Sequence, residues 1–302
     1  MICLTSEKKK RGSISIAAAM VAVVIMMVIG ISMVGCSSGS GVEVKDSTEA
    51  YTWDELSKIS GEIAKASDEN ATVEVAKKYH LTSVDGKLDG TQTKSVTLSN
   101  GMQTAVQIVG FAHDEKADGG KAGITFIFKD CIGEHSMNSS YTNAGGWEAS
   151  EIRSYLNSEG LNLLPSDLKQ AIVSVSKPTN NVGETQDVSS VTMTSDQLWL
   201  FSFIELAGPL DQNAYSSYGL GYVADIFNAE GSEYKLFRDM NVNQSGFNNT
   251  LEKSSNGQSL DWWERSPYPE GSGLFGFVYS DGNPIGGTDA SNFIGVCPGF
   301  CI

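Results

Sequence analysis

The stretch Asp261-Trp262-Trp263-Glu264-Arg265-Ser266-Pro267 opens the part of the chain that decides the fold. It continues through Phe275-Gly276-Phe277-Val278-Tyr279-Ser280-Asp281-Gly282 to Gly295-Val296-Cys297-Pro298-Gly299-Phe300-Cys301-Ile302. Short apolar and aromatic runs alternate with turn-forming residues, which is typical of brief strands joined by tight turns. The apolar run that ends at Ile302 predicts a final strand paired into a sheet, because loose chain ends are usually polar and frayed.

Several separated motifs resemble one large bacterial family of domains of unknown function, family 6273, whose members are mostly exported or surface proteins. Two are Trp-Glu-Arg-Ser-Pro and Phe-x-x-Val-x-Ser-Asp-Gly in the quoted stretch, which closes with Gly-Val-x-Pro-x-Phe-Cys-Ile. The upstream matches are residues 145–157, Gly-Gly-Trp-Glu-Ala-Ser-Glu-Ile-Arg-Ser-Tyr-Leu-Asn, and residues 196–202, Asp-Gln-Leu-Trp-Leu-Phe-Ser. The resemblance covers about residues 94–302. It implies an α+β, C-type-lectin-like domain of short antiparallel strands with two helices, related in shape to formylglycine-generating enzymes. It implies no activity.

Residues 1–35 predict a secretion signal. The basic residues Lys8 to Arg11 precede an uncharged apolar stretch, and the small residue Gly35 precedes Cys36. The stretch resembles a lipoprotein signal, in which Cys36 becomes the lipidated first residue, although Met33 stands where Leu is usual. The alternative is an uncleaved membrane anchor, because the apolar stretch is long enough to span a bilayer. Both interpretations place the rest of the chain on the extracellular face of the cell membrane.

The charge of the chain excludes one class of partner. The whole chain carries −15, and residues 1–35 carry a net +3, so the remainder carries −18. Nucleic acids and anionic membrane surfaces are recognised by basic patches. We therefore expect no nucleic-acid partner, and contact with the membrane only through the N-terminal anchor.

Two segments precede the main domain. Residues 36–50 are small and polar and predict a flexible linker. Residues 51–90 predict a helical segment, because Thr52 and Glu55 form a capping-box pattern and apolar residues follow at helical spacing. These apolar residues are Trp53, Leu56, Ile59 and Ile63, and a second short helix is predicted from Val73 to Tyr79. The sequence leaves open whether this segment packs on the main domain.

Residues 91–302 predict the main, lectin-like domain. Asn100-Gly101 predicts a hairpin turn leading into a strand at 104–111, and another strand is predicted at 123–128. A helix is predicted from Trp147 to Asn157, capped by Ser150. Further expectations are a helix from Leu164 with Leu168, Ile172 and Val175 inside, a buried strand at Trp199, and long loops at 207–233.

The search for catalytic motifs is mostly negative. The three histidines show no metal-ligand spacing, and the hydrolase, phosphate-loop and zinc-protease motifs are missing from the sequence. Residues 271–276 match the dinucleotide-binding glycine pattern, but a strand follows where that site requires a helix. His113-Asp114 is interpreted as a strand-end loop and not as an acid–base pair. Structural roles are expected for Trp147, Trp199, Trp262 and Arg265, with Arg265 paired to an inner carboxylate or to carbonyls.

The C-terminal loops offer a candidate binding surface. Its residues are Tyr268, Asp281, Asn283, Asp289 and Asn292. Aromatic faces beside Asp, Asn and Ser stack on sugar rings and bind hydroxyl groups, although plain polar turns explain the same pattern. No metal or cofactor is predicted. The four Asp and Asn residues offer oxygen ligands for calcium, but their spacing matches no fixed calcium loop.

These observations favour an extracellular, lipid-anchored module that binds a glycan or a protein ligand. One alternative is an enzyme, by analogy with formylglycine-generating enzymes, which hold copper with a pair of C-terminal cysteines. Cys297 and Cys301 superficially suggest such a pair, but their spacing differs, and likeness of fold does not carry function. A third alternative is a structural or interaction domain without a small ligand.

Three cysteines lie beyond the predicted signal and Cys36, so at most one bridge forms within a chain. If residues 297–301 are extended, Cys297 and Cys301 lie roughly 13 Å apart at about 3.3 Å per residue, too far for a disulfide. Pro298-Gly299 leaves a fold-back open. The resemblance to lectin-like domains implies a Cys131–Cys301 bridge, which would leave Cys297 as the odd thiol.

Overall fold

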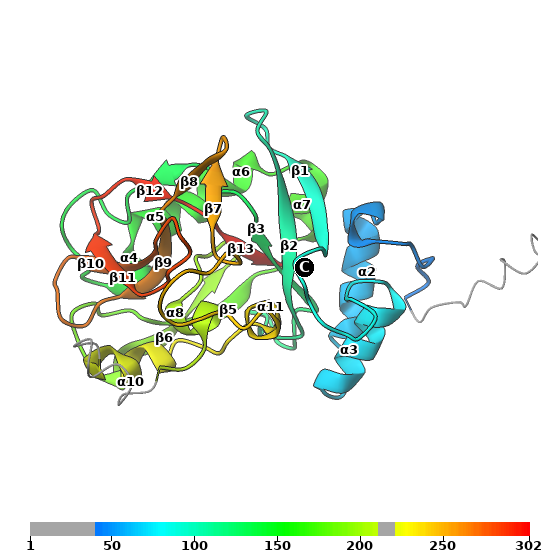
Figure 1. Cartoon of the computed structure of the whole chain (residues 1–302), viewed down its shortest axis with the longest axis horizontal. Coiled ribbons are helices and arrows are strands. Elements are labelled where there is room, and N and C mark those ends of the chain that lie inside the picture. The colour runs from blue at the N-terminus through cyan, green and yellow to red at the C-terminus, as the bar shows by residue number, and fades with distance from the viewer. Residues whose placement is uncertain (1–39, 211–220) are drawn as a thin grey trace, which may run out of the picture. The chain divides into compact units, whose positions relative to one another are not determined.

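The computed structural model describes residues 40–210 and 221–302, and Val44–Ile302 form one compact unit. Strand β13 (Gly299–Cys301) lies at the edge of an antiparallel sheet in the order β1-β2-β3-β13 (Figure 1). Its other strands are β1 (Thr93–Thr97), β2 (Gln103–Phe111) and β3 (Ile124–Phe128). Phe300 pairs with Phe126, and their rings stack at 5.2 Å. The prediction of a final apolar strand within a sheet is confirmed.

A second sheet carries the aromatic C-terminal motifs, in the order β11-β10-β9-β12-β4. Its strands are β4 (Glu134–His135), β9 (Trp262–Pro267), β10 (Leu274–Val278), β11 (Gly286–Asp289) and β12 (Ile294–Gly295). Two hairpins stand beside these sheets: β5 (Val175–Asn180) with β6 (Val191–Asp196), and β7 (Lys253–Ser255) with β8 (Gln258–Leu260). The mixture of mainly antiparallel strands and short helices is an α+β fold.

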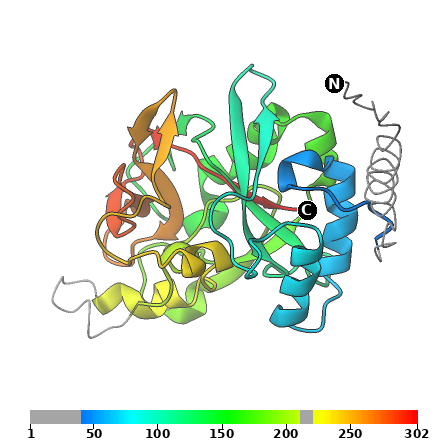
Figure 2. The same cartoon turned by 45° about the vertical axis from the view of Figure 1, so that its right-hand side comes forward.

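Helices α2 (Trp53–Ile63) and α3 (Glu69–Lys78) pack on the first sheet, and Figure 2 shows them in blue and cyan beside it. The predicted capping box is present, with Glu55 N donating to Thr52 Oγ1 at 3.2 Å and Thr52 N to Glu55 Oε2 at 2.8 Å. All four residues of the predicted apolar stripe are buried. Ser60 Oγ donates to the carbonyl oxygen of Ile302, which joins α2 to the end of β13. The helical segment therefore belongs to the same compact unit as the sheet.

Residues 44–50 differ from the expected linker. They contain the 3₁₀ turn η1 (Thr48–Ala50), whose Thr48 is buried. Lys45 Nζ lies 2.5 Å from a carboxylate oxygen of Glu55, so the segment is tied to α2. Cys36 and the rest of the predicted signal lie outside the described residues. Within the described ranges, no helix has the length and apolar character needed to span a bilayer.

The predicted helix from Trp147 to Asn157 is interrupted. It consists of α4 (Gly146–Ala149), α5 (Glu151–Tyr155), a wide π turn η2 (Leu156–Gly160) and α6 (Leu161–Leu163). Ser150 has an extended backbone, which ends α4, and its hydroxyl accepts from Arg153 N, which begins α5. Ser150 is therefore the predicted cap, but it caps a much shorter helix.

Three further differences concern the middle of the chain. Helix α7 (Ser166–Ala171) ends before the predicted inner residue Val175, which instead opens β5. Trp199 is buried as expected but forms only an isolated bridge with Gly299. Residues 207–233, predicted as loops, include η4 (Gly221–Val223) and α10 (Ala224–Asn228). The remaining helices are η3 (Val188–Ser190), α8 (Phe203–Ala207) and α11 (Lys235–Asp239).

Candidate functional site

Five charged or polar side chains meet inside the fold and form what we name the ionic centre. Asp114 lies in the loop after β2, Lys177 in β5 and Glu205 in α8. Tyr234 directly precedes α11, and Arg265 lies in β9. Lys177 Nζ lies 2.8 Å from Asp114 Oδ1 and 2.5 Å from Glu205 Oε1. Arg265 contacts both Glu205 oxygens, at 2.5 and 3.0 Å. The centre joins segments far apart in the sequence.

Arg265 also fixes the backbone around the ionic centre. Its guanidinium donates to the carbonyl oxygens of Leu200, Pro178 and Glu230, at 2.9, 3.1 and 2.9 Å. The planar guanidinium has donors for several acceptors at once, which suits a buried junction between elements. The prediction that Arg265 pairs with an inner carboxylate and carbonyls is confirmed.

The protonation states of the centre follow from its contacts. Burial acts to raise the pKa of Asp114, but the adjacent Lys177 ammonium, His113 and the hydrogen bonds from Lys177 and Thr125 together outweigh burial and hold this pKa well below its usual range. Burial is likewise outweighed at Glu205, where Arg265 and Lys177 lower the pKa. Burial raises the pKa of the Tyr234 phenol. At neutral pH Asp114 and Glu205 are therefore carboxylates, Arg265 is a cation and Tyr234 is a neutral phenol.

Two other buried carboxyl groups behave differently. Burial raises the pKa of Glu230 to about 7, although Arg265 and a hydrogen bond from Ser266 act against this shift. Burial and the neighbouring Glu230 raise the pKa of Glu264 well above its usual value. In the part of the chain that the structure describes, neither carboxyl oxygen of Glu264 has a hydrogen-bond partner. We therefore expect Glu264 to be uncharged at neutral pH.

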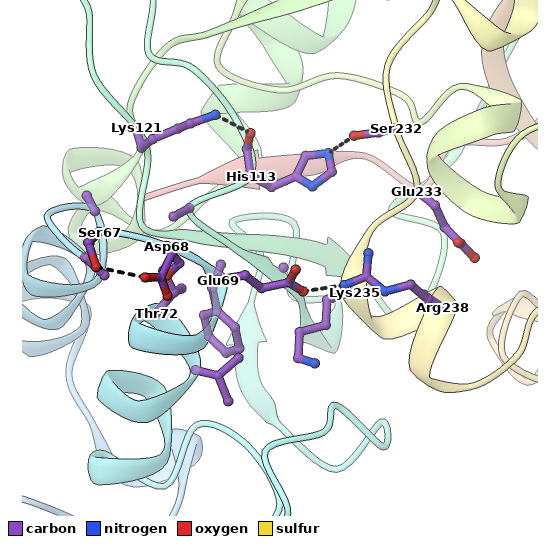
Figure 3. A pocket seen from close by; sticks show the side chains of 16 residues that line it. Ser67, Asp68, Glu69, Thr72, His113, Lys121, Ser232, Glu233, Lys235 and Arg238 are labelled. Carbon is purple, nitrogen blue, oxygen red and sulfur yellow. Dashed lines mark hydrogen bonds and ion pairs between the residues drawn. The ribbon is translucent and has the colours of Figure 1, made fainter.

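A surface pocket of about 440 Å³ is lined by His113, the residue before Asp114 of the ionic centre. Figure 3 shows the side chains that line this pocket. We name it the α3–α11 pocket, because the start of α3, the end of β2, and α11 with the loop before it form its walls. Its polar or charged lining side chains are Ser67, Asp68, Glu69, Thr72, His113, Lys121, Ser232, Glu233, Lys235 and Arg238. Its apolar lining includes Ala64, Ala66, Val73 and Phe111.

His113 connects the pocket with the ionic centre. Its ring stacks on Tyr234 with 4.0 Å between ring centres, and the Tyr234 hydroxyl donates to both Asp114 oxygens at 2.8 and 2.9 Å. A side chain at Gly110 would place its Cβ 2.9 Å from the Tyr234 ring, so the absence of a side chain there allows this packing. Burial lowers the pKa of His113, which keeps the imidazole neutral at neutral pH.

The pocket presents both signs of charge to solvent. Arg238 Nη2 lies 2.5 Å from Glu69 Oε1, and these side chains are 49% and 68% exposed. Lys235 pairs with Asp239, and Lys121 Nζ donates to the His113 carbonyl oxygen at 3.1 Å. The exposed Arg238–Glu69 pair gains little from pairing, so these two groups remain available to a ligand, whereas the Lys235–Asp239 pair is more shielded at 16% and 12% exposed.

Among the described lining residues, His113 Nε2 and Ser232 Oγ, 3.4 Å apart, are the pair that most resembles a catalytic base and a nucleophile. This distance exceeds the usual range for a base that activates a hydroxyl, although catalytic hydrogen bonds are often loose without substrate. Over residues 40–210 and 221–302, no carboxylate is hydrogen-bonded to the other ring nitrogen of His113. The third member of a hydrolytic triad is thus missing among the described residues of this region.

The structure contradicts the predicted ligand role of Tyr268. Its side chain is only 5% exposed and packs in an apolar cluster, with its ring edge-to-face against Phe227 at 5.4 Å. A ring buried in this way offers no face for stacking on a sugar. The turn-forming residues that flank Tyr268 do not indicate, from the sequence alone, that α10 covers its ring.

The other four predicted ligand residues cap their own turns. Asp281 accepts from Asn283 N at 3.0 Å, Asn283 from Ile285 N at 3.2 Å, and Asp289 from Ser291 N at 2.8 Å. Asn292 Nδ2 donates to Thr288 Oγ1 at 2.7 Å. None of them lines the α3–α11 pocket. Among all described residues, no group of three His, Cys, Asp or Glu side chains is placed to hold a metal ion.

The cysteine pairing also differs from the prediction. Cys131 Sγ lies 2.7 Å from Cys297 Sγ, while Cys301 Sγ lies 3.2 Å from Thr125 Oγ1 and 3.3 Å from Asp114 Oδ2. The expected Cys131–Cys301 bridge is therefore wrong for this structure. The reason lies in the backbone, because Ile132 N donates to Val296 O and so brings the Cys131 segment next to Cys297. Cys297 and Cys301 have separate partners and form no copper-holding pair.

Sequence reasoning missed both the ionic centre and the pocket. The dipeptide His113-Asp114 was the available signal, because it placed two titratable residues directly after a buried strand. The sequence pattern indicates only a strand-end loop there, because nothing local shows that Lys177 and Tyr234 meet it. Lys177 and Tyr234 meet His113-Asp114 only in the folded chain, through contacts that the sequence pattern does not contain.

Comparison with known proteins gives one match. The family model described as "Domain of unknown function (DUF6273)" matches residues 122–302. No curated protein and no solved structure matches the chain. The matched region contributes α11 and Lys235 to the pocket, whereas α3 and His113 precede it. The pocket thus lies where the matched region meets the segment before it.

Proposed function

The chain belongs to this family of unknown function, DUF6273, and we propose that it is an extracellular, lipid-anchored binding module whose ligand occupies the α3–α11 pocket. The single observation that supports binding there is a 440 Å³ pocket lined by exposed groups of both charges. Pockets for small ligands have volumes in this range, with a few polar groups that fix orientation. The C-type-lectin-like shape implied by the sequence motifs is part of the proposal, and the α+β arrangement is compatible with it.

The charges of the pocket favour a zwitterionic ligand, such as a short peptide. Lys121, Lys235 and Arg238 can receive carboxylates, and the opposing acids Glu69 and Glu233 can receive an ammonium group. Among the described lining residues, Phe111 has the only benzene ring, and its side chain is buried. A glycan is less favoured, because sugar rings need an exposed aromatic face for stacking.

The binding proposal is tested with the full chain in detergent. A library of di- and tripeptides is screened for a rise in Tm, and hits are measured by calorimetry. We expect Arg238→Gln combined with Lys235→Gln to weaken binding at least tenfold. Lys58→Gln is the matched control, because Lys58 also sits in an exposed ion pair, with Asp54, but outside the pocket.

Two results would contradict the binding proposal. If the pocket variant binds as wild type does, the ligand site lies elsewhere. If a glycan array gives hits that Asn292→Ala abolishes, the turn at 288–292 carries the site after all.

The anchoring proposal rests on the basic residues, the apolar stretch and Gly35-Cys36. Metabolic labelling with a fatty-acid analogue should mark the protein, because lipid is attached to the Cys36 thiol. Cys36→Ala should abolish the label. Label that survives this substitution would exclude Cys36 as the attachment site.

A further inference from the structure

The thiols of Cys131 and Cys297 meet inside the fold, although 166 positions separate them in the sequence. Their sulfur atoms lie 2.7 Å apart, and both side chains are fully buried. Cys131 lies just after β3, and Cys297 lies between β12 and β13. No atom fits between the two sulfurs.

The surrounding backbone holds the two thiols in place. Ile132 N donates to Val296 O and Val296 N donates to Gly133 O, both at 2.9 Å, so the two segments are paired directly beside the cysteines. Cys131 N is also held, by Ser254 O at 2.8 Å. A Cβ at Gly295 would lie 2.6 Å from Cys131 Sγ, so glycine there leaves room for the sulfur. The proximity is a property of the paired backbone and not of one adjustable side chain.

We propose that Cys131 and Cys297 form an intramolecular disulfide when the chain folds in an oxidising compartment. Each thiol loses one proton and one electron, and the two sulfurs become bonded. A disulfide oxidant of the glutathione type accepts the two electrons and two protons and is cleaved into two thiols. The inference does not depend on the ligand pocket, and it agrees with an extracellular location, where disulfides persist.

Cys301 is excluded from this bond by its own contacts. Its sulfur lies against Thr125 Oγ1 and Asp114 Oδ2, at the border of the ionic centre. Burial, together with the negative charge of Asp114, raises the pKa of its thiol well above the usual value. Burial also raises the pKa of the Cys297 thiol, so the position of its sulfur, and not its pKa, keeps Cys301 out of the bond.

Burial of the cysteines also determines when the Cys131–Cys297 disulfide can form. Burial raises the pKa of the Cys297 thiol, and the nearby Lys253 ammonium only partly opposes this effect. Lys253 is itself buried and donates to the Phe128 carbonyl oxygen at 2.8 Å. Exchange in the folded protein is therefore slow, so the bond forms during folding and afterwards resists external reductants.

The test uses the full chain, refolded in detergent from the reduced, denatured state in a mixture of reduced and oxidised glutathione. Free thiols are blocked with N-ethylmaleimide, and peptides are mapped by mass spectrometry without reduction. Chymotrypsin cleaves after Phe300 and so separates Cys297 from Cys301. We expect one linked peptide pair, containing Cys131 and Cys297, with Cys301 recovered as the blocked thiol.

Thermal unfolding provides the second measurement. The bond closes a loop of more than one hundred residues, so wild type that is reduced while unfolded and then refolded with dithiothreitol should have a Tm roughly 5 °C or more below that of the oxidised wild type. Cys297→Ser should unfold at the same temperature with and without dithiothreitol, whereas Cys301→Ser should keep the wild-type difference. The inference is overturned if the link joins Cys301 to either partner. It is also overturned if refolded wild type has native circular dichroism and free thiols at Cys131, Cys297 and Cys301.

Discussion

The ionic centre and the α3–α11 pocket contain the same kinds of side chain in opposite surroundings. In the centre, the side chains of Lys177, Asp114 and Glu205 are between 1% and 3% exposed. In the pocket, Arg238 and Glu69 are 49% and 68% exposed, although their ion pair is as short. The two regions therefore differ in how much water reaches the charged groups, and not in the distance between the charges.

This difference predicts separate roles. Taking a charge out of water costs several kcal/mol, which only close partners and further hydrogen bonds offset. Each member of the centre therefore depends on the others, and losing one leaves an uncompensated charge. An exposed pair is worth only about 0–1 kcal/mol, because water solvates each group when the partner leaves. The centre is suited to holding the fold together, and the pocket is suited to exchanging its partners for a ligand.

The largest expected effect is the loss of a cation from the centre. Lys177→Met should lower the free energy of unfolding by about 3–5 kcal/mol, because Asp114 and Glu205 would remain buried next to each other without their shared cation. Urea denaturation followed by tryptophan fluorescence measures the change. Arg238→Met is the matched substitution in the pocket. The comparison fails if both variants lose similar amounts of stability.

A smaller effect sharpens the comparison through pH. Burial raises the pKa of Glu230 from about 4.5 to about 7, so the folded state binds this proton more tightly than the unfolded state. The resulting stabilisation is complete below pH 4.5 and is lost as the pH rises to about 7. Asp114 and Glu205 have lowered pKa values, so their stabilisation is lost only in acid, as the pH falls through the folded-state pKa values.

Glu230→Gln should remove the loss of stability between pH 4.5 and about 7, because the amide has no proton to release. The amide can also keep hydrogen bonds with Asn180 N and Ser266 Oγ. Between pH 5 and 7, the free energy of unfolding of wild type should fall relative to the variant by up to about 1.4 kcal/mol per pH unit. Urea midpoints measured at pH 5, 6, 7 and 8 provide the check. Parallel curves would show that Glu230 titrates normally.

The smallest expected change in stability is at the pocket. Arg238→Gln should alter the free energy of unfolding by no more than about 0.5 kcal/mol, because the arginine is half exposed and its ion pair is solvated. Arg238→Gln should still weaken the binding of a peptide ligand. Differential scanning fluorimetry with and without the peptide separates the two effects, and a large fall in Tm without peptide would assign Arg238 to the fold.

Local patterns explain what the sequence predicted correctly. The Thr52–Glu55 capping box, the Asn100-Gly101 turn between β1 and β2, and the apolar strand β13 each depend on neighbouring residues. The ionic centre joins five separate elements, so neither hydrophobic periodicity nor spacing along the chain indicates it. Tyr268 shows the same limit, because an aromatic among glycines and prolines has the same local pattern whether another helix covers it or not.

Strand β3 is synthesised long before its edge partner β13. Thr125 and Cys301, which pair across these strands, are 176 positions apart. At about 5–20 residues per second, translation of the intervening chain takes roughly 10–35 s. Throughout that interval one edge of Ile-Thr-Phe-Ile-Phe, buried at every position in the finished sheet, is open to pairing with other chains. Crowding on the ribosome and slow translation therefore favour aggregation until the three residues of β13 have been added.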